Sequence, residues 1–178
     1  MKYLYVGATP EVDRETLEVI CEDALARFGV PVRQVELAEI EFAYDASRKQ
    51  YGSIPVLEML ARWAPADARK LLAVTERDLF IPVLTFVFGQ AQLGGRVGVI
   101  SLARLRQEFY GLLPQREVFL GRVVKEALHE TGHMFGLVHC ADRTCAMSLA
   151  TGVRQIDIKQ TGFCTVCAAR LPAAGELA

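Results

Sequence analysis

The sequence predicts an α+β domain, close to the α/β class, in which helices pack on a layered β-sheet. Two observations predict this fold class. Short segments are apolar throughout or alternate between apolar and polar residues, as strands do, and longer segments repeat apolar residues every three or four positions, as amphipathic helices do. The chain has 178 residues, which fits a single domain, residues 1–178. Hydrophobic residues make up 52% of the chain, enough to build a core.

Strands and helices alternate in the first half of the chain. The strands contain aromatic and β-branched residues or a regular apolar–polar alternation. The first helix has its apolar residues on one face, and Gly29 follows it as a residue suited to end a helix. In chain order, we expect a strand at 2–6, a helix at 13–28, a strand at 31–37, a polar irregular stretch at 39–52 and a helix at 55–63.

The second half contains the longest predicted helix. In chain order, we expect a strand at 70–75, a loop at 78–80, strands at 85–90 and 96–102, and a long helix at 116–136. After this helix the regular periodicity fades. We therefore divide the domain into an N-terminal subdomain, residues 1–136, and a C-terminal subdomain, residues 137–178, which is too short for a hydrophobic core of its own.

Charge and hydropathy exclude several classes of protein. The chain has 20 Lys and Arg residues against 21 Asp and Glu residues, so it lacks the basic surface of a nucleic-acid-binding protein. The longest apolar stretch, 79–89, is too short to span a bilayer, and the N-terminal residues lack the pattern of a signal peptide. We therefore expect a cytoplasmic protein with no nucleic-acid or membrane partner. We also expect a monomer.

All three histidines lie in one window, which reads HETGHMFGLVH. On a helix, His129 and His133 are four residues apart and share a face, so both rings can bind one metal ion. Gly136 can adopt a left-handed conformation and turn the chain back, which lets His139 approach the same ion. Three neutral ligands are typical of an open, catalytic zinc site. Glu130 lies beside them, where its carboxylate can act as general base on a zinc-bound water. The alternative is three ordinary exposed histidines.

Four of the five cysteines lie in the last quarter of the chain. Cys140 and Cys145 form one close pair, and Cys164 and Cys167 form a C-x-x-C pair. Two such pairs separated by a loop match the spacing of a four-thiolate structural zinc site, which would stabilise the short C-terminal subdomain. Two disulfides or a redox-active pair are the alternatives, although cytosolic proteins seldom contain structural disulfides. The sequence thus predicts two zinc ions per chain, one catalytic and one structural.

The histidine motif, H-E-x-x-H-x-x-G-x-x-H, resembles that of the metzincin clan of zinc peptidases. Members of that clan have a methionine in a tight turn beneath the metal, and the resemblance gives this position to Met147. A core methionine that fills a gap is the alternative. The longer run HETGHMFGLVHCADRTCAM, followed by FCTVC, resembles the archaemetzincin family, which joins the zinc-peptidase motif to four cysteines.

The resemblance implies a metzincin-type fold. Its sheet would be twisted, mixed and mostly parallel, with two long helices and an antiparallel edge strand above the cleft, at 85–90 or its hairpin partner. A small zinc-stapled C-terminal subdomain would follow the active-site helix. One feature departs from the pattern: several metzincins place a tyrosine shortly after the methionine turn, whereas all five tyrosines here precede the motif. The resemblance therefore assigns no oxyanion-stabilising group other than the zinc.

The sequence predicts a zinc metallopeptidase that hydrolyses peptides or unfolded protein segments. The alternative from another class is a zinc-stabilised peptide- or protein-binding module with little or no turnover. A third alternative, a zinc-ribbon nucleic-acid binder, requires a dense basic stripe. The basic residues of the cysteine-containing segment are instead scattered: Arg143, Arg154, Lys159 and Arg170.

Overall fold

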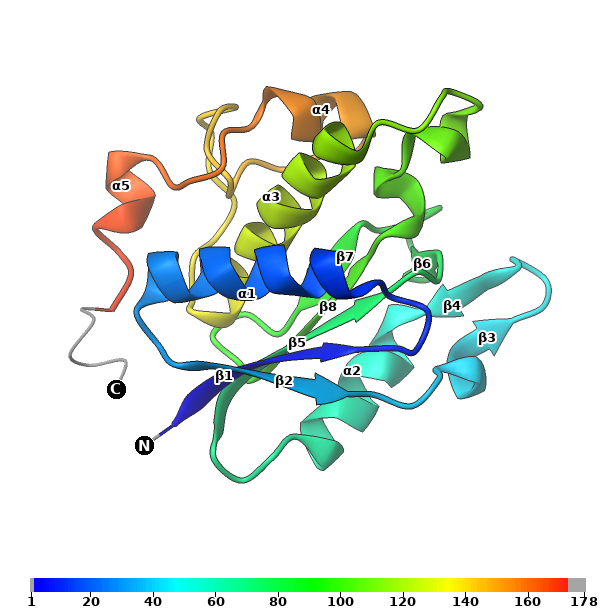
Figure 1. The fold of residues 1–178 in the computed structure, drawn as a ribbon, viewed down its shortest axis with the longest axis horizontal. Helices are drawn as coiled ribbons and strands as arrows, with labels where there is room; N and C mark the ends of the chain where they lie inside the picture. Colours follow the sequence, from blue (N-terminus) through cyan, green and yellow to red (C-terminus); the bar gives the residue numbers. More distant parts are fainter. Residues whose placement is uncertain (1, 173–178) are drawn as a thin grey trace.

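A five-stranded sheet forms the centre of the molecule (Figure 1). The computed structural model describes residues 2–172. The strands of this sheet are β1 (Tyr3–Ala8), β2 (Val32–Glu36), β5 (Ala68–Thr75), β7 (Gly89–Ala91) and β8 (Val97–Ser101). They lie in the order β2-β1-β5-β8-β7, in which β7 at the edge is antiparallel to β8 and the other neighbours are parallel. The predicted mostly parallel sheet with an antiparallel edge strand is confirmed.

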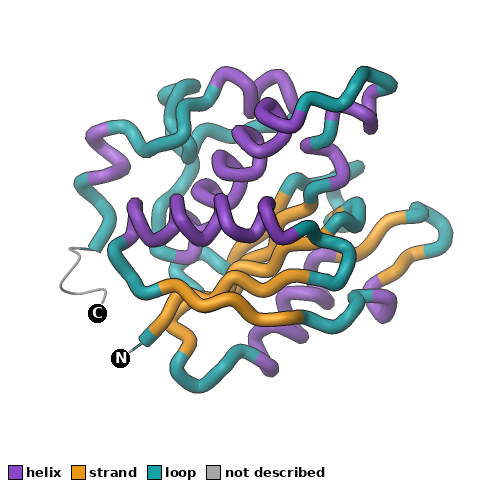
Figure 2. Tube along the Cα trace, in the orientation of Figure 1, coloured by secondary structure: helices purple, strands orange, loops and turns teal. Residues whose placement is uncertain are grey.

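Helices cover both faces of this sheet (Figure 2). They are α1 (Arg14–Phe28), α2 (Ser53–Trp63), α3 (Arg116–Met134), α4 (Val153–Ile158) and α5 (Thr165–Ala168), with short 3-10 turns at Glu41–Ala43, Ala103–Leu105 and Gln107–Tyr110. Helices α1 and α3 pack on one face and α2 on the other. Helix α1 begins after Asp13, whose carboxylate accepts a hydrogen bond from the Thr16 backbone N–H at 2.9 Å. It ends at Gly29, which has φ 62°.

Strand β5 shows why both faces of the sheet are covered. Leu72 and Val74 are buried in the core beneath α1 and α3, whereas Leu71 and Ala73 are buried in the core beneath α2. Because side chains alternate along a strand, a continuous apolar run produces a strand that is apolar on both sides. Such a strand is stable only between two layers of helices.

A second, small sheet corrects two of the sequence predictions. Its strands are β3 (Tyr44–Asp45), β4 (Gln50–Gly52) and β6 (Leu79–Phe80), in the order β3-β4-β6. The prediction of an irregular stretch at 39–52 was wrong where β3 and β4 pair, and the prediction of a loop at 78–80 was wrong where β6 pairs with β4. Strands of two or three residues are too short to show an alternating pattern, so periodicity could not identify them.

The strand predicted at 85–90 was wrong in extent, because strand β7 begins only at Gly89. The apolar residues before it have other partners. Phe88 is buried in the core on the α3 side, and Val87 forms an isolated antiparallel bridge with Leu79. The run is therefore apolar because it packs against the core, and only its last residues enter the sheet.

The chain after α3 has little apolar core of its own. Its small buried cluster consists of Leu137, Cys145, Met147 and Cys167. Helix α4 is held on α3 by Arg122, whose guanidinium bonds both carboxylate oxygens of Asp157 at 2.7 and 2.8 Å. Two of the four residues of this buried cluster are cysteines.

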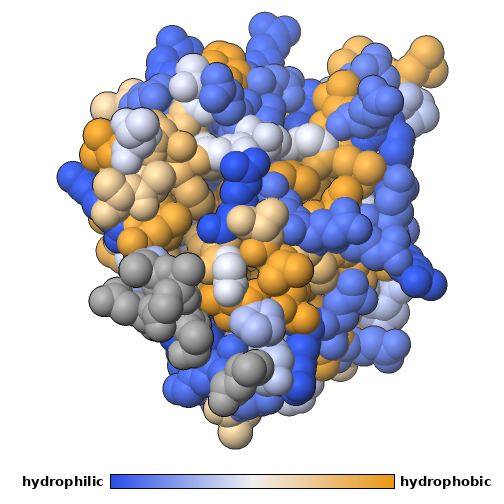
Figure 3. Space-filling model, turned by 60° about the vertical axis from the view of Figure 1, so that its left-hand side comes forward, coloured by the Kyte–Doolittle hydropathy of each residue, from blue (hydrophilic) through white to orange (hydrophobic). Residues whose placement is uncertain are grey.

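The surface mixes polar and apolar side chains. On the face drawn in Figure 3, blue hydrophilic residues are interspersed with orange apolar ones. Among the helices of residues 2–172, none has both the length and the apolar character needed to cross a bilayer.

Candidate metal centres

The three histidines predicted to bind one ion come together in the structure. His129 and His133 project from α3, and His139 lies in the loop that follows. One ring nitrogen of each lies within 4.8 Å of those of the other two. The Nε2 atoms of His129 and His133 are 3.1 Å apart. Two nitrogens bound to one tetrahedral zinc lie roughly 3.3 Å apart, so the spacing fits that ion.

The local sequence explains how His139 reaches this position. Helix α3 ends at Met134, and Gly136 has φ 93°, a left-handed conformation that favours glycine. The backbone N–H of Leu137 then bonds the carbonyl oxygen of Gly132 at 2.9 Å, which closes the reversal. The turn predicted at Gly136 is confirmed, and it returns His139 to the face of α3 that carries His129 and His133.

Two backbone carbonyls orient the rings. His129 Nδ1 lies 2.8 Å from the carbonyl oxygen of Ala146, and His133 Nδ1 lies 2.7 Å from that of Leu137. A carbonyl can only accept, so each Nδ1 is the protonated nitrogen and each Nε2 keeps a lone pair for a metal. Burial lowers the pKa of both histidines, which favours the neutral form that metal binding needs.

Glu130 is buried beside this cluster. It is 4% exposed, and its Oε2 has no hydrogen-bond partner among the described residues. Burial, and secondly the charge of Glu126, raise the pKa of Glu130 well above its ordinary value. A divalent cation held by the histidines would oppose that shift and favour the carboxylate form. The orphaned oxygen and the free histidine nitrogens therefore fit a bound zinc ion.

Met147 lies in a turn against the histidine helix. It is fully buried, and its carbonyl oxygen accepts a hydrogen bond from the Cys140 backbone N–H at 2.9 Å. The backbone N–H of Ser148 bonds the Cys145 carbonyl at 2.9 Å, which tightens the turn. Gly132 leaves the space that the sulfur of Met147 occupies, because a Cβ there would overlap it. The methionine thus packs on α3 at Gly132, which lies between the two helical histidines in the sequence.

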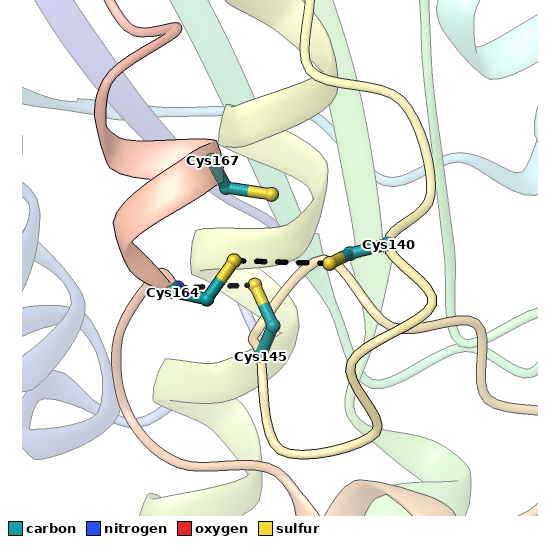
Figure 4. A group of neighbouring side chains, drawn as sticks. All are labelled: Cys140, Cys145, Cys164 and Cys167. Atoms are coloured by element: carbon teal, nitrogen blue, oxygen red, sulfur yellow. Dashed lines mark hydrogen bonds between the residues drawn. The ribbon is translucent and has the colours of Figure 1, made fainter.

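The four predicted cysteines form a second cluster (Figure 4). Cys140 and Cys145 lie on the loop after α3, and Cys164 and Cys167 lie at α5. Their sulfur atoms all lie within 4.8 Å of one another, and the Cys140 and Cys164 sulfurs are 3.8 Å apart. Thiolates on a tetrahedral zinc, at about 2.3 Å from the ion, lie roughly 3.8 Å from each other. All five cysteines of the chain are free in the structure, so its geometry does not favour the disulfide alternative.

Local hydrogen bonds favour the thiolate form of one member of this cluster, whereas burial raises the pKa of Cys145 and Cys167, whose thiolates would need a bound cation. The pKa of Cys164 is lowered to about 7, chiefly by a hydrogen bond from the Cys167 backbone. The Cys164 backbone N–H also donates to the sulfur of Cys145 at 3.3 Å. Backbone N–H groups aimed at sulfur stabilise negative charge, and zinc binds cysteine as the thiolate.

The histidine cluster opens into a cavity of about 490 Å³. Its lining comes from β7 with the loop before it, from α3, and from the loops that carry His139 and Thr151. Much of the lining is apolar: Ile81, Leu84, Phe86, Phe88, Leu93, Val138 and Leu149. An apolar cleft with a few convergent polar groups is typical of a ligand-binding site.

Strand β7 touches Glu130 directly. Gly89 has no side chain, and a Cβ at this position would lie 2.6 Å from Cγ of Glu130 and 2.8 Å from the carbonyl oxygen of Val99. The edge strand can therefore approach the site this closely only with glycine. The family resemblance predicted an edge strand above the cleft at 85–90, but nothing in the sequence indicated a role for Gly89.

Sequence reasoning also missed two charged residues in the cavity wall. Glu126 and Lys159 both line the cavity and form an ion pair, Nζ to Oε1, at 3.1 Å. The spacing of Glu126 from His129 and Glu130, three and four residues, puts it on the same face of α3 and could have indicated it. For Lys159 the sequence contains no comparable signal. None of the five tyrosines lines the cavity.

Comparison with known proteins agrees with these features. Residues 64–173 match the family model described as peptidase family M54. The archaemetzincin of Methanocaldococcus jannaschii is 43% identical over 130 residues, which are 73% of this chain and 70% of that protein. The archaemetzincin of Pyrococcus furiosus is 36% identical over 93% of this chain and 88% of its own length.

Solved structures show the same fold. The crystal structure of the archaemetzincin from Methanopyrus kandleri is 33% identical, with a TM-score of 0.86 over 98% of this chain and 96% of that one. A zinc-dependent peptidase from Methanocorpusculum labreanum is 30% identical, with a TM-score of 0.86 over 95% of this chain and 100% of that one. The resemblance read from the histidine and cysteine motifs is confirmed, and the chain belongs to peptidase family M54, the archaemetzincins, a family of zinc metallopeptidases.

Proposed function

We propose that this archaemetzincin hydrolyses peptide bonds with Glu130 as general base. Membership of a zinc-peptidase family supports the activity. One observation carries the catalytic role: three histidine ring nitrogens converge beside a buried carboxylate oxygen that has no partner among the described residues.

His129, His133 and His139 are the proposed ligands of the catalytic ion, each through one ring nitrogen. When bound, zinc supplies Lewis-acid chemistry, since it polarises a substrate carbonyl and lowers the pKa of water to roughly 7. The carbonyls of Ala146 and Leu137 hold two of the rings in the tautomer and orientation this requires. The orientation of these two histidine rings is therefore fixed before the substrate binds.

Glu130 moves the proton. As a water oxygen attacks the carbonyl carbon of the peptide, the Glu130 carboxylate accepts a proton from that water. It then delivers the proton to the amine nitrogen as the C–N bond breaks. The close approach of Gly89 confines the carboxylate to one side, which keeps it aimed at the reacting groups.

The cavity suits an extended peptide substrate. Strand β7 pairs with β8 on one side and ends the sheet on the other. An extended peptide can add to such an edge through backbone hydrogen bonds, while apolar lining residues accept its side chains. We propose that the substrate is a peptide or an unfolded protein segment bound in this way.

We also propose a second, structural zinc ion on Cys140, Cys145, Cys164 and Cys167. Its support is the convergence of four free sulfurs where the chain has few other buried apolar groups. This ion would hold residues 137–172 of the predicted C-terminal subdomain to the rest of the chain; residues 173–178 of that subdomain lie outside the described residues. Met147 packs with Cys145 and Cys167 and against Gly132 of α3, so it would support the helix that carries two of the histidine ligands.

Hydrolysis of a pooled peptide library tests the proposed function. The zinc-loaded protein should produce new peptide termini, detected by mass spectrometry, and a chelator should abolish them until zinc is restored. Zinc-loaded protein that binds peptides from the pool without cleaving any would contradict the proposal and favour the binding module.

Replacing Gly89 by alanine tests the contact between β7 and the general base. Because the added Cβ would overlap Glu130 and the Val99 carbonyl, either the strand or the carboxylate must shift. We expect kcat to fall at least about tenfold, since displacement of a catalytic group by about 1 Å can cost up to ~10²-fold. Overpacking should also lower stability by about 1–3 kcal/mol. Initial rates and thermal unfolding measure the two effects.

Gly121→Ala is the matched control. Gly121 lies within α3, and an added Cβ there meets nothing within 4 Å. Alanine is preferred over glycine inside a helix by up to about 1 kcal/mol, so this variant should be fully active and slightly more stable. If the Gly89→Ala and Gly121→Ala proteins were equally active, the catalytic role of Glu130 would not depend on the absence of a side chain at position 89.

A further inference from the structure

A buried ion pair in the cavity wall has no part in the mechanism above. Lys159 Nζ donates to Oε1 of Glu126 at 3.1 Å, and the two side chains are 1% and 3% exposed. Both residues line the cavity that contains the three histidines and Glu130. Glu126 lies on the same helix as the histidines, and Lys159 directly follows α4.

Folding stability does not explain this pair. Burying two charges costs several kcal/mol per ion, and apolar residues of similar volume often give equal or greater stability. The attachment of α4 to α3 is already provided by Arg122, which bonds both oxygens of Asp157 and the Leu105 carbonyl. A second pair is thus not needed to hold α4, and a buried charge in a cleft points to a role in function.

The ammonium of Lys159 has more N–H donors than it uses among the described residues. It carries three N–H groups, and among residues 2–172 its one hydrogen bond is to Glu126. Apart from the histidines, Lys159 is the one basic side chain among the described residues of the cavity lining. Burial has the largest effect on these groups, raising the pKa of Glu130 and lowering that of the three histidines, and the charge of Lys159 lowers the pKa of all four.

We propose that Lys159 is a catalytic residue that binds the carbonyl oxygen of the scissile peptide and stabilises the negative charge that develops there. Glu126 is its positioning residue, because its carboxylate holds Nζ in the wall of the cavity. The inference rests on the proposed peptidase function. It assigns the oxyanion-stabilising group that a tyrosine after the methionine turn would otherwise supply.

The electron pair and the proton can be followed through the hydrolysis. When the water oxygen bonds to the carbonyl carbon, the π-electron pair moves to the carbonyl oxygen and the water proton passes to Glu130. Lys159 donates a hydrogen bond to that oxygen and stays protonated throughout. When the C–N bond breaks, the electron pair returns and Glu130 gives its proton to the amine. Lys159 binds the charged oxygen more strongly than the neutral carbonyl, so its effect falls on kcat rather than KM.

The test compares zinc-loaded, full-length variants on one peptide that the wild type hydrolyses. Lys159→Met removes the charge at similar length, and Glu126→Gln/Lys159→Met avoids an unpaired buried carboxylate. Asp157→Asn breaks the ion pair with Arg122 outside the cavity and is the structural control. For each protein we would measure kcat, KM, zinc content and Tm. Calorimetry would give the Kd of two ligands. One is a phosphinic peptide, whose anionic phosphinate mimics the attacked carbonyl. The other is its neutral analogue, in which an N-methyl amide replaces the phosphinate.

Both Lys159 variants should lose about 10²–10³-fold in kcat, the range for one oxyanion donor, with KM changed less than about threefold. Zinc content should be unchanged. The phosphinic peptide should bind more weakly by a factor similar to the loss in kcat, and the N-methyl analogue should bind as before. Asp157→Asn should lower the Tm and leave kcat unchanged.

Five results would overturn the assignment. Wild-type kcat in the double variant, or equal weakening of the two analogues, would exclude the oxyanion role and leave the peptidase function intact. Loss of kcat that follows loss of zinc, or that Asp157→Asn reproduces, would make the pair structural. A wild type that neither hydrolyses peptides nor binds the phosphinic peptide would overturn both this inference and the proposed function.

Discussion

Zinc-loaded Glu130→Gln protein should hydrolyse peptides at least about 10²-fold more slowly than the wild type, the lower range for loss of general acid–base catalysis. Glutamine keeps the shape of glutamate but cannot accept a proton from water. The variant should keep its zinc content and its Tm, because the amide fills the space of the buried carboxylate and Oε2 of Glu130 has no hydrogen-bond partner to lose among the described residues. Initial rates, metal analysis and thermal unfolding measure the three quantities.

Glu117→Gln is the matched control, since it makes the same chemical change on the same helix. Glu117 is exposed in the first turn of α3, far along the helix from the histidines. Its substitution should leave hydrolysis unchanged. If fully metallated Glu130→Gln protein turned over peptide as fast as the Glu117 variant, Glu130 would not be the general base.

The parts of the site that could be predicted are those encoded in local spacing. His129 and His133 share a helical face because they are four residues apart, and Gly136 permits the turn that returns His139. The cysteine pairs were identified in the same way. Backbone geometry dictates each of these relations over a few residues, so no knowledge of the tertiary fold was needed. The long strands and helices, whose periodicity extends over many residues, were predicted for the same reason.

The parts that could not be predicted depend on contacts between distant segments. Lys159 meets Glu126 across 33 positions of sequence, and nothing near either residue specifies the other. Gly89 contacts Glu130 only because the sheet places β7 beside α3. Strand β6 exists because β4 lies beside it, although its own two residues show no pattern. These features follow from packing between segments that are distant in the sequence.

Replacing Cys167 by serine should lower the Tm by roughly 8–16 °C and the zinc content from two ions per chain to one. Cys167 is 5% exposed and belongs to a buried cluster of four residues, two of them cysteines, so the proposed ion would hold this small cluster together. A structural zinc supplies on the order of 10 kcal/mol or more of binding free energy. The Tm of a chain of this size falls by about 2–4 °C for each kcal/mol of stability lost, so loss of even about 4 kcal/mol gives the expected decrease.

The comparison with His133→Ala separates the two centres. That variant should also lose one zinc ion, but its Tm should fall less, because His133 lies on a helix that packs on the main core of the sheet. Cys21→Ser is the matched control for the chemical change. Cys21 is half-buried on α1, where the Gln34 side chain donates to its sulfur at 3.5 Å, so both zinc ions should remain. Equal losses of Tm in the Cys167 and His133 variants would show that the cysteine centre is no more structural than the histidine centre. Disulfides mapped among the four clustered cysteines of the zinc-loaded protein would remove the thiolates that a second ion requires.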